Sequence, residues 1–281
     1  MKILRKFSVV ALIIFFGGQF FAQKEACAQV MEVGGSIGLS YYMGDINPKK
    51  PFNQSKLGWG VLVRFYGGTR WAFRLAYSNL QLAGSDKESG YRPERGLSFT
   101  NNVHDVALMA EFNFLDYFTG SKRNGLTPYL FGGISVLMFN PKAEDGTELC
   151  NVLTDVSGYN DNNGTLEDNI NNGNAKYSKV AVSIPFGIGA KYSLSRRIGL
   201  ALEWRWDLAL TDWLDDCHSY YPLQNNAYSD PTGFSNGSPY IQRGSANDYD
   251  WYGYLNLSMT YKFNLPNGND CNKRERYKNY N

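Results

Sequence analysis

The chain has 281 residues, of which 43% are hydrophobic, 19% charged and 15% aromatic, with 29 Gly and 4 Cys. Charged residues fall below the usual quarter of a soluble domain while aromatic residues and Gly are abundant, which excludes a disordered chain, a coiled coil and a disulfide-dense miniprotein. The net charge is +2, but residues 1–28 hold four basic side chains and one acidic one. Taking these from the 28 basic and 26 acidic residues leaves 24 and 25, a net charge of −1, so the bulk charge does not indicate a nucleic-acid partner.

Residues 1–28 are typical of a secretory signal peptide. A basic start precedes an apolar stretch over 9–16, which is too short to span a membrane as a helix. Cleavage after Ala28 and cleavage after Ala22 both fit the sequence. No later apolar run approaches the length of a membrane helix, about 18 residues. We therefore expect an exported chain without a membrane-spanning helix.

The rest of the chain alternates between apolar and polar or small side chains with a period of two, which indicates strands. In residues 197–210, bulky apolar side chains occupy every second position, and Gly, Ala or charged side chains lie between most of them. Such strands are longer than the usual globular strand of about 5–6 residues. Eight are predicted: 33–43, 57–66, 70–82, 103–114, 127–139, 180–192, 197–210 and 251–263.

The two faces of these strands decide where a barrel would lie. A soluble barrel turns its apolar face inward, whereas a membrane barrel turns that face outward around a polar lumen. Here the apolar face is too bulky and aromatic for the interior of eight strands, and the other face is small or charged. The sequence therefore predicts an all-β, eight-stranded antiparallel outer-membrane barrel over 29–263, followed by a C-terminal tail over 264–281.

The predicted connections alternate in length, as the external loops and periplasmic turns of such barrels do. The long ones are 44–56, 83–102, 140–179 and 211–250, and the short ones are 67–69, 115–126 and 193–196. Both termini are then expected in the periplasm. The 115–126 connection is long for a turn, and a partner contact is one interpretation of its length. Pro185 lacks the N–H that a strand needs, so we expect a bulge there, flanked by Gly187 and Gly189.

Charged side chains on the predicted inner face are expected to pair with one another, because an unpaired buried charge is costly. An eight-stranded barrel is just wide enough for its own side chains to fill. We therefore predict a closed, salt-bridged plug rather than a conducting pore. Its charged residues are Arg64, Arg74, Glu111, Glu203, Arg205 and Asp207.

Signals for catalysis or metal binding are weak. His218 lies beside Ser219 with Asp residues nearby, but adjacency in sequence is not the geometry of a triad. Three Asp within 211–216 lack EF-hand spacing, so a capped turn is the simpler interpretation than a Ca²⁺ site. We expect no catalytic residue, cofactor or metal. The alternative is a lipid enzyme of the outer membrane that uses His218 or His104.

The cysteines lie where disulfides can form. Cys150 and Cys217 both fall in long external loops, and we predict a disulfide between them. Cys271 falls in the tail. It can pair with Cys27 only if the signal peptide is cleaved after Ala22, and it is unpaired if cleavage follows Ala28.

Several short motifs follow one another along the chain. They are 40–46 (SYYMGDI), 97–99 (LSF), 127–133 (TPYLFGG) with 140–141 (NP), 183–189 (SIPFGIG), 211–216 (TDWLDD), and 243–244 (RG) followed by 250–252 (DWY). In this order they resemble the PorG-type outer-membrane proteins of the type IX secretion system. The motif residues singled out are Gly44, Asp45, Pro128, Tyr129, Pro185, Gly187, Asp212, Asp215, Asp216, Arg243, Gly244 and Trp251.

The resemblance implies a structural, non-enzymatic barrel of Bacteroidota. Such a barrel would tie the periplasmic ring of the secretion system, built from the PorK lipoprotein and PorN, to the outer membrane. PorK, PorN and membrane lipid are therefore the expected partners. The alternative is a small OmpA- or OmpW-like barrel that acts as a passive channel or as a stabiliser of the membrane.

Overall fold

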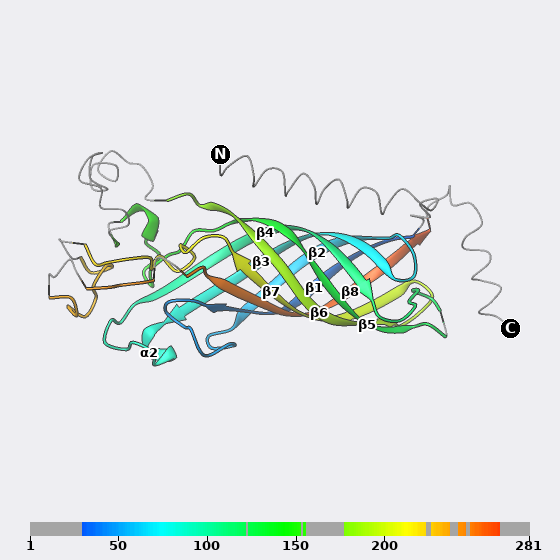
Figure 1. Ribbon diagram of the computed structural model, residues 1–281, viewed down its shortest axis with the longest axis horizontal. Helices are drawn as coiled ribbons and strands as arrows, with labels where there is room; N and C mark the ends of the chain where they lie inside the picture. The colour runs from blue at the N-terminus through cyan, green and yellow to red at the C-terminus, as the bar shows by residue number, and fades with distance from the viewer. Residues whose placement is uncertain are drawn as a thin grey trace, which may run out of the picture.

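The structure, a computed structural model, describes residues 30–121, 123–152, 154–155, 177–222, 226–236, 241–245 and 248–264. These residues form eight antiparallel strands that close into a barrel, in which each strand pairs with its sequence neighbours and the last pairs with the first (Figure 1). The strands are β1 Val30–Met43, β2 Lys56–Tyr66, β3 Trp71–Ser85, β4 Ser98–Asn113, β5 Leu126–Met138, β6 Val180–Ser193, β7 Ile198–Ala209 and β8 Trp251–Asn264. The predicted fold class is confirmed.

Two short helices complete the described elements, α2 Asp86–Ser89 and a 3-10 turn at Leu149–Asn151. None of the helices within the described ranges is long and apolar enough to cross a membrane. The predicted signal peptide, the predicted tail beyond residue 264, Cys27 and Cys271 lie outside the described residues.

Burial follows the predicted faces. On β4, Val106 and Leu108 are 44% and 55% exposed, while the alternate residues Asp105 and Ala107 are fully buried. Large exposed apolar side chains recur in this way along every strand. An apolar outer wall around a polar interior is the arrangement of a barrel in lipid. The predicted membrane barrel, with its polar lumen, is therefore confirmed.

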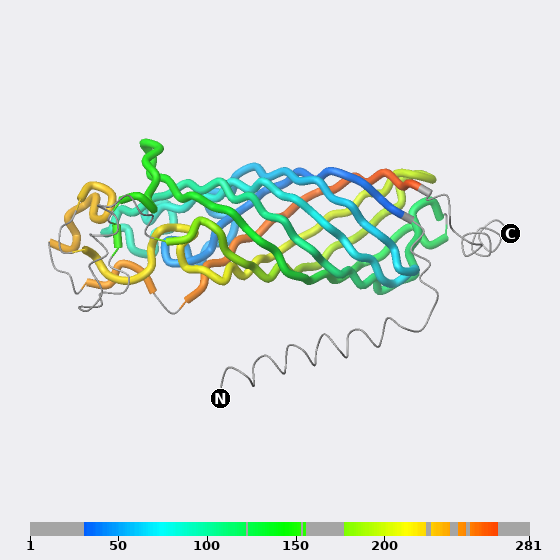
Figure 2. Tube along the Cα trace, turned by 90° about the horizontal axis from the view of Figure 1, so that it is seen from above, coloured from blue at the N-terminus to red at the C-terminus, as the bar shows by residue number. Residues whose placement is uncertain are grey.

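The connections gather at the two ends of the barrel (Figures 1 and 2). At the turn end lie the short connections 67–70, 114–125 and 194–197, together with the start of β1 and the end of β8. At the loop end lie the described parts of the long connections 44–55, 86–97, 139–179 and 210–250. The alternation in length matches the prediction.

The β3–β4 hairpin is longer than predicted, since its strands reach Ser85 and start again at Ser98. Leu82 and Ala83 are buried although they point to opposite faces of β3, and Leu82 packs in a core with Phe99. Because other loops cover the hairpin on both faces, its sequence loses the alternation that indicates a strand.

The 114–125 turn folds into the end of the barrel, and this accounts for its length. The Thr119 hydroxyl donates to Glu32 in the lumen. Lys262 donates from Nζ to the Thr119 carbonyl and lies 3.5 Å from the centroid of the Phe118 ring. Tyr117 and Thr119 are each only 2% exposed. The turn therefore closes the lumen at the turn end.

The expected bulge at Pro185 is absent. The register between β5 and β6 is the same on both sides of Pro185, since Gly132 pairs with Phe186 and Ser135 with Ser183. The ladder is interrupted for two residues and then resumes. Because proline has no N–H to donate, β6 loses its pairing with β5 at this position without inserting an extra residue, while Pro185 still pairs with Asp207 of β7.

On the outer wall, an aromatic cluster spans the seam where β1 meets β8. Tyr41 pairs in register with Gly253, and its ring occupies the space that a Cβ at residue 253 would need. Trp204 donates from Nε1 to the Tyr41 hydroxyl at 2.8 Å. The Phe52 ring, from the β1–β2 loop, lies 4.4 Å from the Tyr41 ring. The cluster therefore fixes both the seam and this loop.

Candidate functional site

The lumen holds three cations and three carboxylates in one connected network. All six side chains project inward from strands and are at most 4% exposed. Ionised groups of this kind are tolerated in an interior only when each finds a partner. The lumen network, as we name it, consists of Glu32, Arg64, Arg74, Glu111, Lys191 and Glu203.

Glu111 is the centre of the lumen network. Its Oε2 lies 2.9 Å from Arg64 Nε and accepts a hydrogen bond from Lys191 Nζ at 2.5 Å. Its other oxygen lies 3.1 Å from Arg74 Nε. One carboxylate therefore separates three cations that would otherwise repel one another.

The other two carboxylates complete the pairing. Glu203 accepts hydrogen bonds from Arg74 Nη1 at 2.5 Å and from the Tyr129 hydroxyl. Glu32 accepts from Arg64 Nη1 at 3.1 Å. The six charges of the lumen network balance, and all six side chains are buried in the interior.

A second ionic group lies nearer the loop end. Arg205 Nη2 donates to Asp105 at 2.7 Å and to Asp207 at 2.6 Å. The Tyr252 hydroxyl also donates to Asp105, at 3.2 Å. Of the six lumen residues predicted from sequence, four therefore join the lumen network and two form this second group.

Three partners were not among the predicted lumen charges. Glu32 lies one residue before the predicted first strand, and the alternation continued back to residue 30 would have found it. Lys191 and Asp105 lie at inward positions of strands that were predicted. A charged side chain at such a position indicates a lumen partner, so both could have been included.

At the loop end, the buried Arg95 ties three loops together. Its guanidinium binds both carboxylate oxygens of Asp86, at 2.6 and 3.1 Å. It also donates to the Asp45 carbonyl at 2.9 Å and to the Arg243 carbonyl. Such forked pairing is the geometry in which arginine is most selective. Arg95 was missed because no periodic pattern marks a loop residue.

Arg243 has a similar role within the β7–β8 loop. It donates to the Asp216 carbonyl and pairs with the carboxylate of Asp155 at 3.7 Å. The Asp155 carboxylate in turn accepts hydrogen bonds from the backbone N–H groups of His218 and Ser219. The large loops therefore form a packed, polar cap.

The predicted disulfide between Cys150 and Cys217 is wrong, because both are free thiols. The Cys217 thiol donates to the Arg243 carbonyl at 3.1 Å. The Cys150 thiol contacts the side-chain oxygens of Asn151 and Asn140, at 3.4 and 3.7 Å. The two cysteines thus pack in separate surroundings of the cap, and burial raises the pKa of each thiol.

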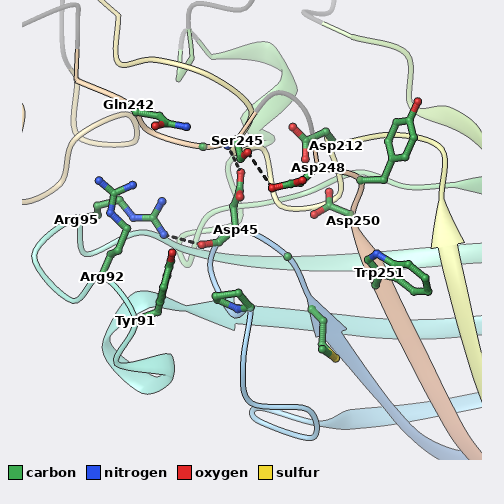
Figure 3. Close-up of a pocket in the computed structure, with 15 residues that line it drawn as sticks. Asp45, Tyr91, Arg92, Arg95, Asp212, Gln242, Ser245, Asp248, Asp250 and Trp251 are labelled. Atoms are coloured by element: carbon green, nitrogen blue, oxygen red, sulfur yellow. Dashed lines mark hydrogen bonds between the residues drawn. The ribbon is translucent and has the colours of Figure 1, made fainter.

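A pocket of about 580 Å³ opens between these loops. Figure 3 shows Asp45 near its centre, beside Arg95 and Ser245, with Tyr91 and Arg92 on one side and the other aspartates opposite. The Ser245 N–H donates to Asp45 Oδ2 at 2.6 Å. Four carboxyl groups line the pocket, those of Asp45, Asp212, Asp248 and Asp250.

These carboxyl groups have perturbed acidities. Burial raises the pKa of Asp212 to about 10, and the neighbouring Asp215 and Asp45 add to the shift. Burial also raises the pKa of Asp250 well above its usual range, and Asp212 raises it further. Ionising several of these groups together is unfavourable, because like charges would be confined in little solvent. Asp212 therefore holds its proton at neutral pH.

Both histidines contact neighbouring polar and aromatic side chains in the described structure. His218 Nδ1 lies 2.6 Å from Asp212 Oδ2, and its ring lies 4.5 Å from Trp213. The Ser219 hydroxyl donates to Asp155 at 2.7 Å. His104 lies on the outer side of β4 and contacts the Tyr77 hydroxyl at 2.8 Å. Within the described ranges, no group of three or more His, Cys, Asp or Glu side chains is arranged to hold a metal ion.

The motif residues singled out from sequence occupy two regions. Eight lie at the loop end, in or beside the cap: Gly44, Asp45, Asp212, Asp215, Asp216, Arg243, Gly244 and Trp251. Four lie in the barrel wall: Pro128, Tyr129, Pro185 and Gly187. Segments about 200 residues apart thus meet at one mouth, as when the Ser245 N–H binds Asp45.

These features define the class of the protein, a transmembrane β-barrel with a charge-filled lumen and a capped mouth. A family model described as a domain of unknown function (DUF6089) matches residues 8–272, and the chain belongs to this family. Among proteins of curated function, none matches the chain in sequence.

Solved structures similar to this chain include three bacterial proteins. Ail of Yersinia pestis is 10% identical with a TM-score of 0.40, over 84% of this chain and 99% of that one. Neisserial surface protein A is 11% identical with a TM-score of 0.40, over 83% and 97%. The outer membrane protein OprG of Pseudomonas aeruginosa is 8% identical with a TM-score of 0.36, over 85% and 97%.

The substitution Glu111→Gln should destabilise the barrel by about 3–5 kcal/mol, because it leaves three cations facing two carboxylates in a closed lumen. Unfolding by urea in lipid vesicles, followed by tryptophan fluorescence, measures the loss. The double variant Glu111→Gln/Lys191→Met removes one charge of each sign and should recover part of it. Glu144→Gln, an exposed control, should stay within about 0.5 kcal/mol of wild type. A Glu111→Gln barrel as stable as wild type would show that the network does not hold the fold.

The cap should loosen as the pH rises. An unfolded Asp has a pKa of about 3.9, whereas folded Asp212 keeps its proton up to a pKa of about 10. Above the unfolded value the folded cap binds more protons than the unfolded loop, so stability falls as pH rises between these values. Thermal loss of the cap at pH 6 and pH 9, followed by the fluorine NMR signal of fluorotryptophan at Trp213, measures the effect.

Asp212→Asn should reduce this pH dependence, because the amide does not ionise; Asp250, whose pKa is also raised, keeps part of the dependence. Asp145→Asn is the matched control, since Asp145 is a fully exposed loop-end carboxyl whose pKa is lowered by a hydrogen bond from the Thr147 N–H. An Asp212→Asn cap that keeps the wild-type dependence would contradict the assignment.

Proposed function

We propose that this protein is a structural outer-membrane component of the type IX secretion system. In this proposal the loop end faces outward and the turn end faces the periplasm, where the protein contacts the ring of PorK and PorN. The system and the partners come from the resemblance of the sequence motifs to PorG-type barrels. The outer membrane is where barrels of this architecture lie.

The observation that carries a structural role is the filled lumen. Six paired charges occupy its middle, the 114–125 turn closes one end, and the cap covers the other. A barrel of this kind has surfaces that partners can bind but no open pore for solutes. This suits a component that connects the secretion machinery to the membrane. The motif residues in the cap hold the loops together, which supports the assignment of those motifs to the fold.

Crosslinking in intact cells tests the secretion role. Purification of the tagged protein after crosslinking should recover PorK or PorN, because the turn end would lie against the ring. An unrelated outer-membrane barrel of the same cells, tagged and processed in parallel, is the control. Recovery of neither ring protein, at equal yields of the two barrels, would refute the role.

Conductance tests the alternative of a passive channel. The purified protein in a planar lipid bilayer should give no steady unitary conductance, because its interior is filled by side chains. A reproducible unitary conductance, absent from bilayers treated with detergent alone, would favour the channel over the structural component.

A further inference from the structure

Charge is unevenly distributed at the turn end. The described residues of its three turns include four exposed arginines and a single exposed carboxylate, Asp116. Asp116 pairs with Arg70 at 2.7 Å. The other arginines have no carboxylate within ion-pair distance in the described part of the chain. We name them the turn-end arginine patch: Arg123, Arg196 and Arg197.

The fold holds the two turns of the patch together. The Gly120 N–H donates to Ser193 Oγ at 2.7 Å, and the Ser193 N–H donates to the Gly125 carbonyl at 2.6 Å. Gly120 has a φ of 98°, and a Cβ there would lie 2.6 Å from the Arg196 carbonyl oxygen. Only glycine permits this approach. The turn that carries Arg123 is therefore fixed against the turn that carries Arg196 and Arg197.

The position of the patch favours a protein partner over lipid. The turn that carries Arg123 also sends Thr119 into the lumen to bind Glu32, so this turn extends over the barrel opening. Lipid surrounds the outer wall of a barrel and does not cover its opening. Arg197 is nearer the wall, where it donates to the Tyr261 hydroxyl at 2.8 Å. A guanidinium binds carboxylate and phosphate groups alike through two parallel hydrogen bonds, so it is the position over the opening that favours a protein carboxylate.

We propose that the turn-end arginine patch binds a carboxylate-rich surface of the periplasmic ring. This inference rests on the proposed function, which places the turn end in the periplasm and the ring against it. Opposite charges attract over about 8 Å at physiological salt, so a prearranged basic patch would both orient the barrel and select an acidic surface. Because the lumen is closed, a partner at this end cannot enter the barrel and would instead contact the turns.

The test is recovery of the ring by the tagged, full-length protein from detergent-solubilised native membranes. Reversing the patch by Arg123→Glu, Arg196→Glu and Arg197→Glu should lower recovery roughly tenfold or more, because attraction becomes repulsion. The conservative variant with Lys at the three positions keeps the charge and should retain most of the recovery. Wild-type recovery should fall as salt rises to about 1 M, where screening shortens to about 3 Å.

The matched control reverses three exposed lysines at the other end of the barrel. Lys50→Glu, Lys56→Glu and Lys87→Glu make the same change in net charge at the loop end and should leave recovery unchanged. Heat modifiability on gels, together with the yield of barrel in the outer membrane, identifies variants that fail to fold. If the variant with Glu at the three patch positions fails to fold, the recovery of the ring by the variant with Lys at these positions is compared with that of wild type.

The outcomes separate the two proposals. If wild type recovers the ring and the reversed variant recovers as much, the patch proposal is overturned while the secretion role stands. If wild type recovers no ring even after crosslinking, the secretion role fails and the patch proposal fails with it. If the reversed variant keeps the ring but loses co-purifying anionic phospholipid, the patch binds head groups and the proposal is overturned.

Discussion

The constraint on which this structure depends is charge balance inside a closed wall. Glu111 lies within ion-pair distance of Arg64, Arg74 and Lys191, and none of these side chains has access to bulk solvent. Removing any one charge leaves the remaining five unbalanced in a medium that solvates charge poorly. Because the partners project from different strands, the same pairing that solvates the charges also fixes the order and register of the wall.

The cap meets the same constraint by a different route. In the lumen, charges of opposite sign neutralise one another, whereas at the pocket several carboxyl groups face one another and the pKa of Asp212 rises until it keeps its proton. Arg95 and Arg243 donate most of their hydrogen bonds to backbone carbonyls and to carboxylates away from the pocket centre. The cap is thus held together by hydrogen bonds where the arginines lie and is sensitive to pH where the aspartates meet.

The wall was predictable from sequence and the cap was not, for a physical reason. Strand burial repeats every second residue, so Glu111 and Arg64 could be assigned to the lumen from their immediate neighbours. The partner of Glu111 at Lys191 is 80 residues away, and no local pattern specifies it. Contacts of Arg95, Cys150 and Cys217 depend on how separate loops pack, which explains both the missed arginine and the wrong disulfide. Pro185 shows the same limit, since a missing N–H can interrupt a ladder without shifting it.

The aromatic cluster at the seam between β1 and β8 also constrains how the barrel closes. The ring of Tyr41 fits over residue 253 because that position is glycine. A slip of two residues between β1 and β8 would keep the inner and outer faces but place Tyr41 opposite Trp251 or Leu255. Those side chains would occupy the space of the ring. The packing of Tyr41 therefore helps to set the register of β1 against β8. A register shifted by two residues would produce a steric clash, whereas the native register allows the hydrogen bond from Trp204 to Tyr41.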